Sequence, residues 1–155
     1  MNITSDQVRE KLKVFDGKYF WQKTSKKAQL WDTGYFIPKL ENLKEKVVLA
    51  RIEMARILDV SIHDLHLVHT GINGRYDCDN YAKMGCSIVH ALHDRECRKI
   101  GSNAMQFAIF TMARSDKNHT QAICLTQEGW YIVEFINGEI KHWKEIKNLK
   151  LMLVE

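Results

Sequence analysis

Hydrophobic residues recur at intervals of three and four in the first two thirds of the chain, which is the period of helices that bury one face. This spacing predicts helices over residues 6–12, 39–58 and 81–99. Ser5 or Thr4 can cap the first of them, because a short hydroxyl side chain accepts a hydrogen bond from a free amide of the first turn. The first part of the chain is therefore expected to be mainly helical.

Two segments between these helices lack a clear period. Residues 60–68 fit either a short helix or a turn. Residues 18–38 are rich in aromatic side chains and are expected to be irregular and folded over the core, with room for a short strand. Gly85 lies inside the third helix at a cost of about 1 kcal/mol relative to alanine, which indicates a close approach by another backbone.

The pattern changes to short hydrophobic runs separated by polar turns after Gly101-Ser102. These runs predict strands over residues 104–113, 119–126, 129–135, 139–143 and 149–154, and Asn137-Gly138 is a typical hairpin turn. Helices followed by consecutive hairpins indicate an α+β domain, with a Cys-bearing helix packed on an antiparallel sheet of the C-terminal half. We expect residues 1–155 to form a single domain.

Composition narrows the class of protein. The 155 residues are 45% hydrophobic and 27% charged, with a net charge of +4, so a core can form while an acidic partner is neither required nor excluded. The chain shows neither a secretory leader nor an apolar run of about 20 residues. The expected location is the cytoplasm, where Cys78, Cys86, Cys97 and Cys124 would be reduced. No cofactor and no membrane association are expected.

The stretch Arg75-Tyr76-Asp77-Cys78-Asp79-Asn80-Tyr81-Ala82 follows the glycine-marked loop Gly71-Ile72-Asn73-Gly74 and leads into the third helix. Asp77 or Asp79 can cap that helix. Free amides and the helix dipole favour a thiolate over a thiol there, and the same amides can hold a developing oxyanion. Cys78 is therefore a candidate nucleophile, although free cysteines are also among the most often buried residues.

A thiol nucleophile needs a base, and the base needs an orienting group. His119 begins one predicted strand, and Glu134 ends the next. Two antiparallel neighbours joined at Gln127-Glu128-Gly129 bring the start of the first beside the end of the second. His119 and Glu134 are therefore expected to meet, with Cys78 above them if its helix packs over that corner.

These residues resemble the papain-like superfamily, and within it the small transglutaminase-like and NlpC/P60-like members. The likeness lies in Tyr76-Asp77-Cys78-Asp79-Asn80-Tyr81-Ala82, in His119-Thr120-Gln121-Ala122, and in Trp130-Tyr131-Ile132-Val133-Glu134. The chain is similar in particular to small phage-encoded proteins with the same three short motifs. The likeness covers about the second half of the chain. It implies a papain-like, transglutaminase-like fold.

The resemblance implies a cysteine peptidase, amidase or acyl transferase acting on a protein or peptide. Cys78 would be the nucleophile, His119 the base and Glu134 its orienting group. Gln22 is the residue that the family's upstream glutamine suggests for the oxyanion, and Asp77 and Asp79 are further oxyanion or substrate candidates. The chain departs from the family in having Glu134 rather than Asp or Asn, and Thr120 rather than Ala after the histidine.

Other functions fit parts of the same sequence. An inactive member of the fold would bind a protein, such as a factor of a phage host. Lysines near Trp21, Trp31 and Trp143 could bind nucleic acid, but interleaved acidic residues favour a solvated face and make this partner less expected.

A metal site is a further alternative on the third helix. Cys86, His90, His93 and Cys97 share one helical face, and two of them with Cys124 or His69 could bind zinc. All four cannot bind one ion, because Cys86 and Cys97 would lie roughly 16 Å apart along the axis. No metal is therefore predicted, and a semi-buried helix face is preferred.

Overall fold

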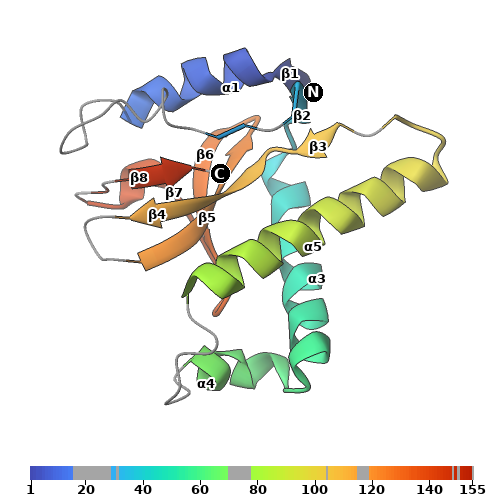
Figure 1. Ribbon diagram of the computed structural model, residues 1–155, viewed down its shortest axis with the longest axis vertical. Coiled ribbons are helices and arrows are strands. Elements are labelled where there is room, and N and C mark those ends of the chain that lie inside the picture. Colours follow the sequence, from blue (N-terminus) through green and yellow to red (C-terminus); the bar gives the residue numbers. More distant parts are fainter. Residues whose placement is uncertain are drawn as a thin grey trace.

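The computed structural model describes residues 1–15, 29–30, 32–69, 78–103, 105–114, 119–147, 149 and 151–154 (Figure 1). The chain begins with β1 (Asn2–Thr4), α1 (Ser5–Leu12) and the 3₁₀ helix η1 (Lys13–Phe15). Thr4 caps α1 by accepting a hydrogen bond from the Gln7 amide, while the Gln7 side chain accepts one from the Thr4 amide. This reciprocal capping box confirms the first predicted helix and one of its two candidate caps.

The other helices also follow the predicted periods. After β2 (Gly34–Phe36), α3 (Leu40–Leu58) ends at Asp59, whose positive φ of 53° closes the helix. The ambiguous segment forms the 3₁₀ helix η2 (Ile62–Asp64) and the short α4 (Leu65–His69). The third predicted helix is α5 (Cys78–Lys99), which begins at the candidate nucleophile itself.

The larger sheet has five strands in the order β7-β6-β5-β4-β8. All its neighbours are antiparallel. Its strands are β4 (Ile109–Arg114), β5 (His119–Thr126), β6 (Gly129–Glu134), β7 (Glu139–His142) and β8 (Leu151–Val154), and the 3₁₀ helix η3 (Trp143–Glu145) follows β7. The predicted hairpins are confirmed, and β8 adds to the β4 edge rather than beside β7.

A second sheet of three strands was not predicted from the sequence. Its order is β1-β2-β3, with β3 (Gln106–Phe107) parallel to β2. The single predicted strand over 104–113 is therefore wrong, because the chain changes sheets at Ala108. The Ala108 amide donates to Phe36 of β2, whereas its carbonyl accepts from Leu125 of β5.

Helices cover both faces of the larger sheet, as Figure 1 shows for α1 and α5. One core packs α1, η1 and the N-terminal strands against residues such as Phe110, Ile123 and Trp130. The other packs α3 and α5 against the opposite face, on which Ala122, Cys124 and Val133 lie. Alternating side chains of one strand thus enter two different cores.

The expected layout of N-terminal helices followed by one C-terminal antiparallel sheet is wrong in two respects. Strands β1 and β2 come from the N-terminal part, and the β2–β3 pair is parallel. The architecture is therefore only loosely α+β. The physical reason is that the first residues pair with Gly34–Phe36, which supplies an edge for the chain that leaves α5.

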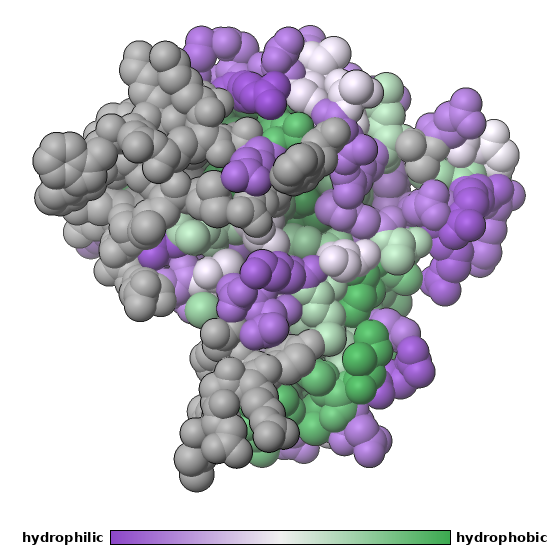
Figure 2. Space-filling model, viewed as in Figure 1, coloured by the Kyte–Doolittle hydropathy of each residue, from purple (hydrophilic) through white to green (hydrophobic). Residues whose placement is uncertain are grey.

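Hydrophobic residues are not confined to the two cores. Figure 2 shows them gathered at the end of the molecule where α3 and α4 lie, and Ile52, Ile57 and Leu67 are among the exposed large hydrophobic side chains. No helix in the described ranges combines the length and apolar character needed to cross a membrane.

Gly85 is explained by a side chain rather than by a backbone. A Cβ built at Gly85 would lie 2.3 Å from the ring of Phe135, which is fully buried just after β6. The glycine therefore allows α5 to lie directly on this ring. The expected approach of another backbone at this position is wrong.

We predict that Gly85→Ala lowers the free energy of unfolding by about 2 kcal/mol, because overpacking against a rigid ring outweighs the gain of about 1 kcal/mol in helix propensity. Urea denaturation followed by circular dichroism measures this change. Ser87→Ala, on the exposed side of α5, is the control and should be close to neutral. Adding Phe135→Leu should recover part of the loss, and strict additivity of the two changes would contradict the contact.

Candidate active site

The thiol of Cys78, the first residue of α5, lies near the beginning of β5, the central strand of the larger sheet. Its sulfur accepts a hydrogen bond from the Thr120 amide at 3.3 Å. Cys78 is only partly buried. Cys78 is the first residue of α5, so the positive end of the helix dipole lies at this sulfur.

The Thr120 amide has no partner in β6, because β6 ends one residue before the position that would pair with it. The register runs from Thr126↔Gly129 to Ala122↔Val133, which would set Thr120 opposite Phe135. Arg51 of α3 instead donates from Nε to the Phe135 carbonyl at 2.9 Å and from Nη2 to the Ile136 carbonyl at 3.1 Å. Arg51 thus holds the chain in a turn after β6.

His119 and Glu134 meet as predicted. Nε2 of His119 lies 2.6 Å from Oε2 of Glu134, and the two side chains are 26% and 13% exposed. Since Nε2 faces the carboxylate, Nδ1 is the ring nitrogen left for proton exchange. The Cys78 sulfur accepts from the amide of Thr120, the residue that follows His119, and is not hydrogen-bonded to the imidazole.

Two buried residues that we did not predict extend this pair. Gln121 donates from Nε2 to Glu134 Oε2 at 3.1 Å, and its Oε1 accepts from Arg114 Nη1 at 2.9 Å. The Ile136 amide donates to the other carboxylate oxygen at 3.3 Å. Strand alternation could have identified Gln121, because it lies two residues from His119 on the same face. Arg114 could be identified only from the register of β4 against β5, which sets Arg114 opposite His119.

A polar pocket of about 480 Å³ opens beside this network. His119 and Glu134 line it together with Arg114 and Gln121. Its other lining residues include Asn137, Glu139, Lys141, Glu145 and Lys147. Both signs of charge are present, so the pocket suits a polar substrate group rather than a purely anionic one.

The weaker predictions for this site have different outcomes. Gln22 and Asp77 lie outside the described residues. Asp79 lies within the first turn of α5, not at its cap, and its Oδ2 pairs with Lys83 Nζ at 2.7 Å. A carboxylate has no proton to donate, so the Asp79 side chain cannot hold an oxyanion.

The histidines and cysteines of α5 have structural partners. His90 Nε2 lies 3.1 Å and 3.2 Å from the carbonyls of Phe107 and Ile109, and Nδ1 lies 2.9 Å from Gln106 Nε2. Cys86 and Cys124 are buried. In the described parts of the chain, no three His, Cys, Asp or Glu residues are arranged to hold a metal ion.

The lysines considered for nucleic-acid binding are partly neutralised. Lys141 pairs with Glu139 at 2.5 Å, and Lys46 is buried and pairs with Glu96 at 2.6 Å. Lys144 lies over the Trp143 ring at 5.9 Å from its centroid. Lys23, Lys26, Lys27 and Lys150 lie outside the described residues. These contacts favour a mixed surface over a basic binding face.

Two solved structures share this fold. A crystal structure of Polyporus squamosus lectin, bound to the human-type influenza-binding epitope Neu5Aca2-6Galb1-4GlcNAc, has a TM-score of 0.65 at 12% identity and matches 99% of this chain and 49% of that one. A PSL1a–E64 complex has a TM-score of 0.63 at 10% identity, with 99% and 51% covered. This chain thus spans about half the length of each. No protein-family model and no curated protein matches it.

These comparisons correct the expected fold. The two solved structures described above are those of a Polyporus squamosus lectin and of PSL1a, not of papain-like or transglutaminase-like proteins. The short motifs around Cys78, His119 and Glu134 suggested that fold, but they span too few residues to determine the path of the remaining chain. At these identities the likeness concerns the fold and carries no assignment of activity.

We predict that native alkylation by iodoacetamide modifies Cys78 and Cys97 and spares Cys86 and Cys124. Burial raises the pKa of both spared thiols, so their reactive thiolate stays scarce even as the pH rises to about 9. Peptide mass spectrometry measures the four modifications, and unfolding in urea should make all four cysteines reactive. Native modification of Cys86 at a rate close to that of Cys97 would contradict this packing.

Proposed function

We propose that this chain is a thiol hydrolase or acyl transferase acting on an amide-type bond, with Cys78 as nucleophile, His119 as base and Glu134 as the group that orients the base. One observation carries the proposal. The Cys78 sulfur accepts from the Thr120 amide at 3.3 Å, and the preceding residue of β5, His119, is paired with a carboxylate at 2.6 Å. Three elements, α5, β5 and β6, supply these groups.

The first step is proton transfer from the Cys78 thiol to Nδ1 of His119. Glu134 stabilises the imidazolium through Nε2, and the Thr120 amide stabilises the thiolate. No hydrogen bond joins the thiol to the ring in this structure, so the ring must move toward the sulfur when substrate binds. Catalytic hydrogen bonds are often long before the substrate is present.

The thiolate then attacks the carbonyl carbon, and the positive end of the α5 dipole stabilises the oxyanion. The imidazolium gives its proton to the leaving amine as the C–N bond breaks, which leaves a thioester on Cys78. Water attacks the thioester while His119 takes its proton, and a carboxylic acid is released. If an amine attacks instead of water, the product is a new amide and the overall reaction is acyl transfer.

A protein or peptide is the proposed substrate. The pocket beside His119 has acidic and basic side chains, including Glu139, Lys141 and Lys147. Such a lining suits a peptide segment with polar side chains and backbone amides. Gln121 and Arg114 are positioning residues in this scheme, because Gln121 donates to the Glu134 carboxylate and Arg114 donates to Gln121.

Carbohydrate binding is a second candidate function, and the lectin neighbour is the observation that favours it. The matched region is only about half of that lectin chain, and identity is 12%. Isothermal titration calorimetry with Neu5Aca2-6Galb1-4GlcNAc, using the wild-type protein and Cys78→Ala, tests this candidate. Equal binding by both proteins would favour a sugar site that does not need the thiol, and no binding would remove the candidate.

We predict that His119→Ala lowers the rate of Cys78 alkylation by at least about tenfold at a pH of about 6.5, because a positioned base no longer accepts the thiol proton. The rate is measured in a protein whose other three cysteines are replaced by Ser. His66→Ala, at an exposed histidine of α4, is the matched control and should leave the rate unchanged.

Equal alkylation of wild-type and His119→Ala would contradict the proposed base. A panel of fluorogenic peptide amides then tests turnover, which Cys78→Ala should abolish. A reactive Cys78 with no turnover on proteins or peptides would leave a protein-binding role as the better interpretation.

We predict that Gln121→Leu reduces Cys78 alkylation by about threefold to tenfold, since it removes the side chain that fixes the Glu134 carboxylate. The conservative variant Gln121→Glu would place a second carboxylate beside Glu134 and should be more damaging than Leu to folding stability. Thermal melting is measured alongside alkylation. Unchanged alkylation in a folded Gln121→Leu protein would mean that Glu134 is held without this contact.

A further inference from the structure

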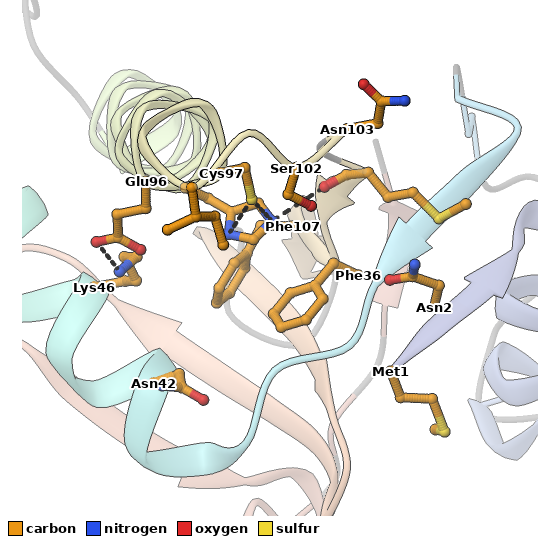
Figure 3. Close-up of a pocket in the computed structure, with 13 residues that line it drawn as sticks. Met1, Asn2, Phe36, Asn42, Lys46, Glu96, Cys97, Ser102, Asn103 and Phe107 are labelled. Carbon is orange, nitrogen blue, oxygen red and sulfur yellow. Dashed lines mark hydrogen bonds and ion pairs between the residues drawn. The ribbon is translucent and has the colours of Figure 1, made fainter.

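A second cavity of about 480 Å³ lies at the other end of α5 from Cys78 (Figure 3). Cys97, which lines it, is roughly 28 Å from Cys78 along the helix axis at 1.5 Å per residue. The cavity lies among α3, α5, β2, β3 and the first residues of the chain. Its volume is typical of small-molecule sites, and it shares no lining residue with the polar pocket beside His119.

Lys46 is the only Lys or Arg side chain among the described residues that line this cavity. It is 5% exposed and pairs through Nζ with Oε1 of Glu96 at 2.6 Å, while Glu96 is 47% exposed. An ammonium has three protons to donate, and Glu96 is its one hydrogen-bond partner among the described residues. A buried ammonium with spare donors in a cavity wall favours a second anionic ligand.

The remaining walls are mainly aromatic and aliphatic. The Phe36 ring stacks on His93 with centroids 4.8 Å apart, and Phe107, Met105 and Ile100 complete this side. Burial lowers the pKa of His93, so its ring is neutral, and Nε2 donates to the Met105 carbonyl. Flat rings and thioethers at these positions suit a planar apolar group.

We propose that this cavity binds a small carboxylate with a flat apolar body. The carboxylate would accept from Lys46, and the apolar body would lie against Phe36, Phe107 and Met105. Asn42 and Ser102 line the same cavity and can hydrogen-bond a polar substituent. Because Glu96 is half exposed, its carboxylate can turn to solvent as the ligand takes its place. This binding is independent of the proposed hydrolase.

Titration calorimetry with 2-naphthoate and with the neutral 2-naphthamide tests the proposal on the full chain. We expect 2-naphthoate to bind at least tenfold more tightly than 2-naphthamide. Lys46→Met, which keeps an apolar stem of similar length, should remove this difference. Glu96→Gln should instead tighten 2-naphthoate binding severalfold, because the competing carboxylate is gone while Lys46 keeps its charge.

The alkylation rate of Cys97 reports whether 2-naphthoate binds in this cavity. In a Cys78→Ser protein, saturating 2-naphthoate should slow the alkylation of Cys97 at least threefold, because Cys97 lines the cavity. Failure of 2-naphthoate to bind, equal binding of acid and amide, or undiminished alkylation of Cys97 would overturn the proposal. If Lys46→Met does not fold, weaker or unchanged 2-naphthoate binding by Glu96→Gln overturns it equally.

Discussion

The arrangement around Cys78 depends on a backbone amide that the sheet leaves without a strand partner. Arg51 takes the carbonyls of Phe135 and Ile136, so β6 ends at Glu134 and the Thr120 amide faces the start of α5. Had β6 continued by one residue, that amide would have entered the sheet. An arginine on α3 therefore decides where the thiol can lie, although it touches neither the sulfur nor the imidazole.

The same turn supports Glu134. The Gly138 amide donates to the Glu134 carbonyl at 2.8 Å, while the Ile136 amide donates to the Glu134 side chain. Gly138 has φ of 79°, and a Cβ there would lie 2.8 Å from Nη1 of Arg51. Glycine at this position thus adopts the positive φ of the turn and leaves space for the Arg51 guanidinium. The Glu134 carboxylate is thus held at one oxygen by the Ile136 amide and at the other by the Gln121 side chain.

Local sequence patterns predicted the elements well where one period dominated. The capped first helix, the long third helix and the hairpins of β5, β6 and β7 follow directly from spacing and turn residues. The His119–Glu134 pair followed from strand order alone. The three-stranded sheet could not be predicted, because β1, β2 and β3 are only two or three residues long and pair across wide gaps in the sequence. The role of Arg51 could not be predicted from the sequence either, since its contacts depend on how α3 crosses the sheet.

Ala108 joins the two sheets through its own peptide groups, with its amide bonded to β2 and its carbonyl to β5. Phe107 and Ile109, on its two sides, enter the core of α3 and α5, whereas Ala108 and Phe110 enter that of α1. A strand reverses its inward and outward side chains when its register shifts by one. An insertion or deletion of one residue at this junction would therefore invert the faces of one sheet relative to the other. Length variation among homologous chains is expected to be excluded here and confined to the turns.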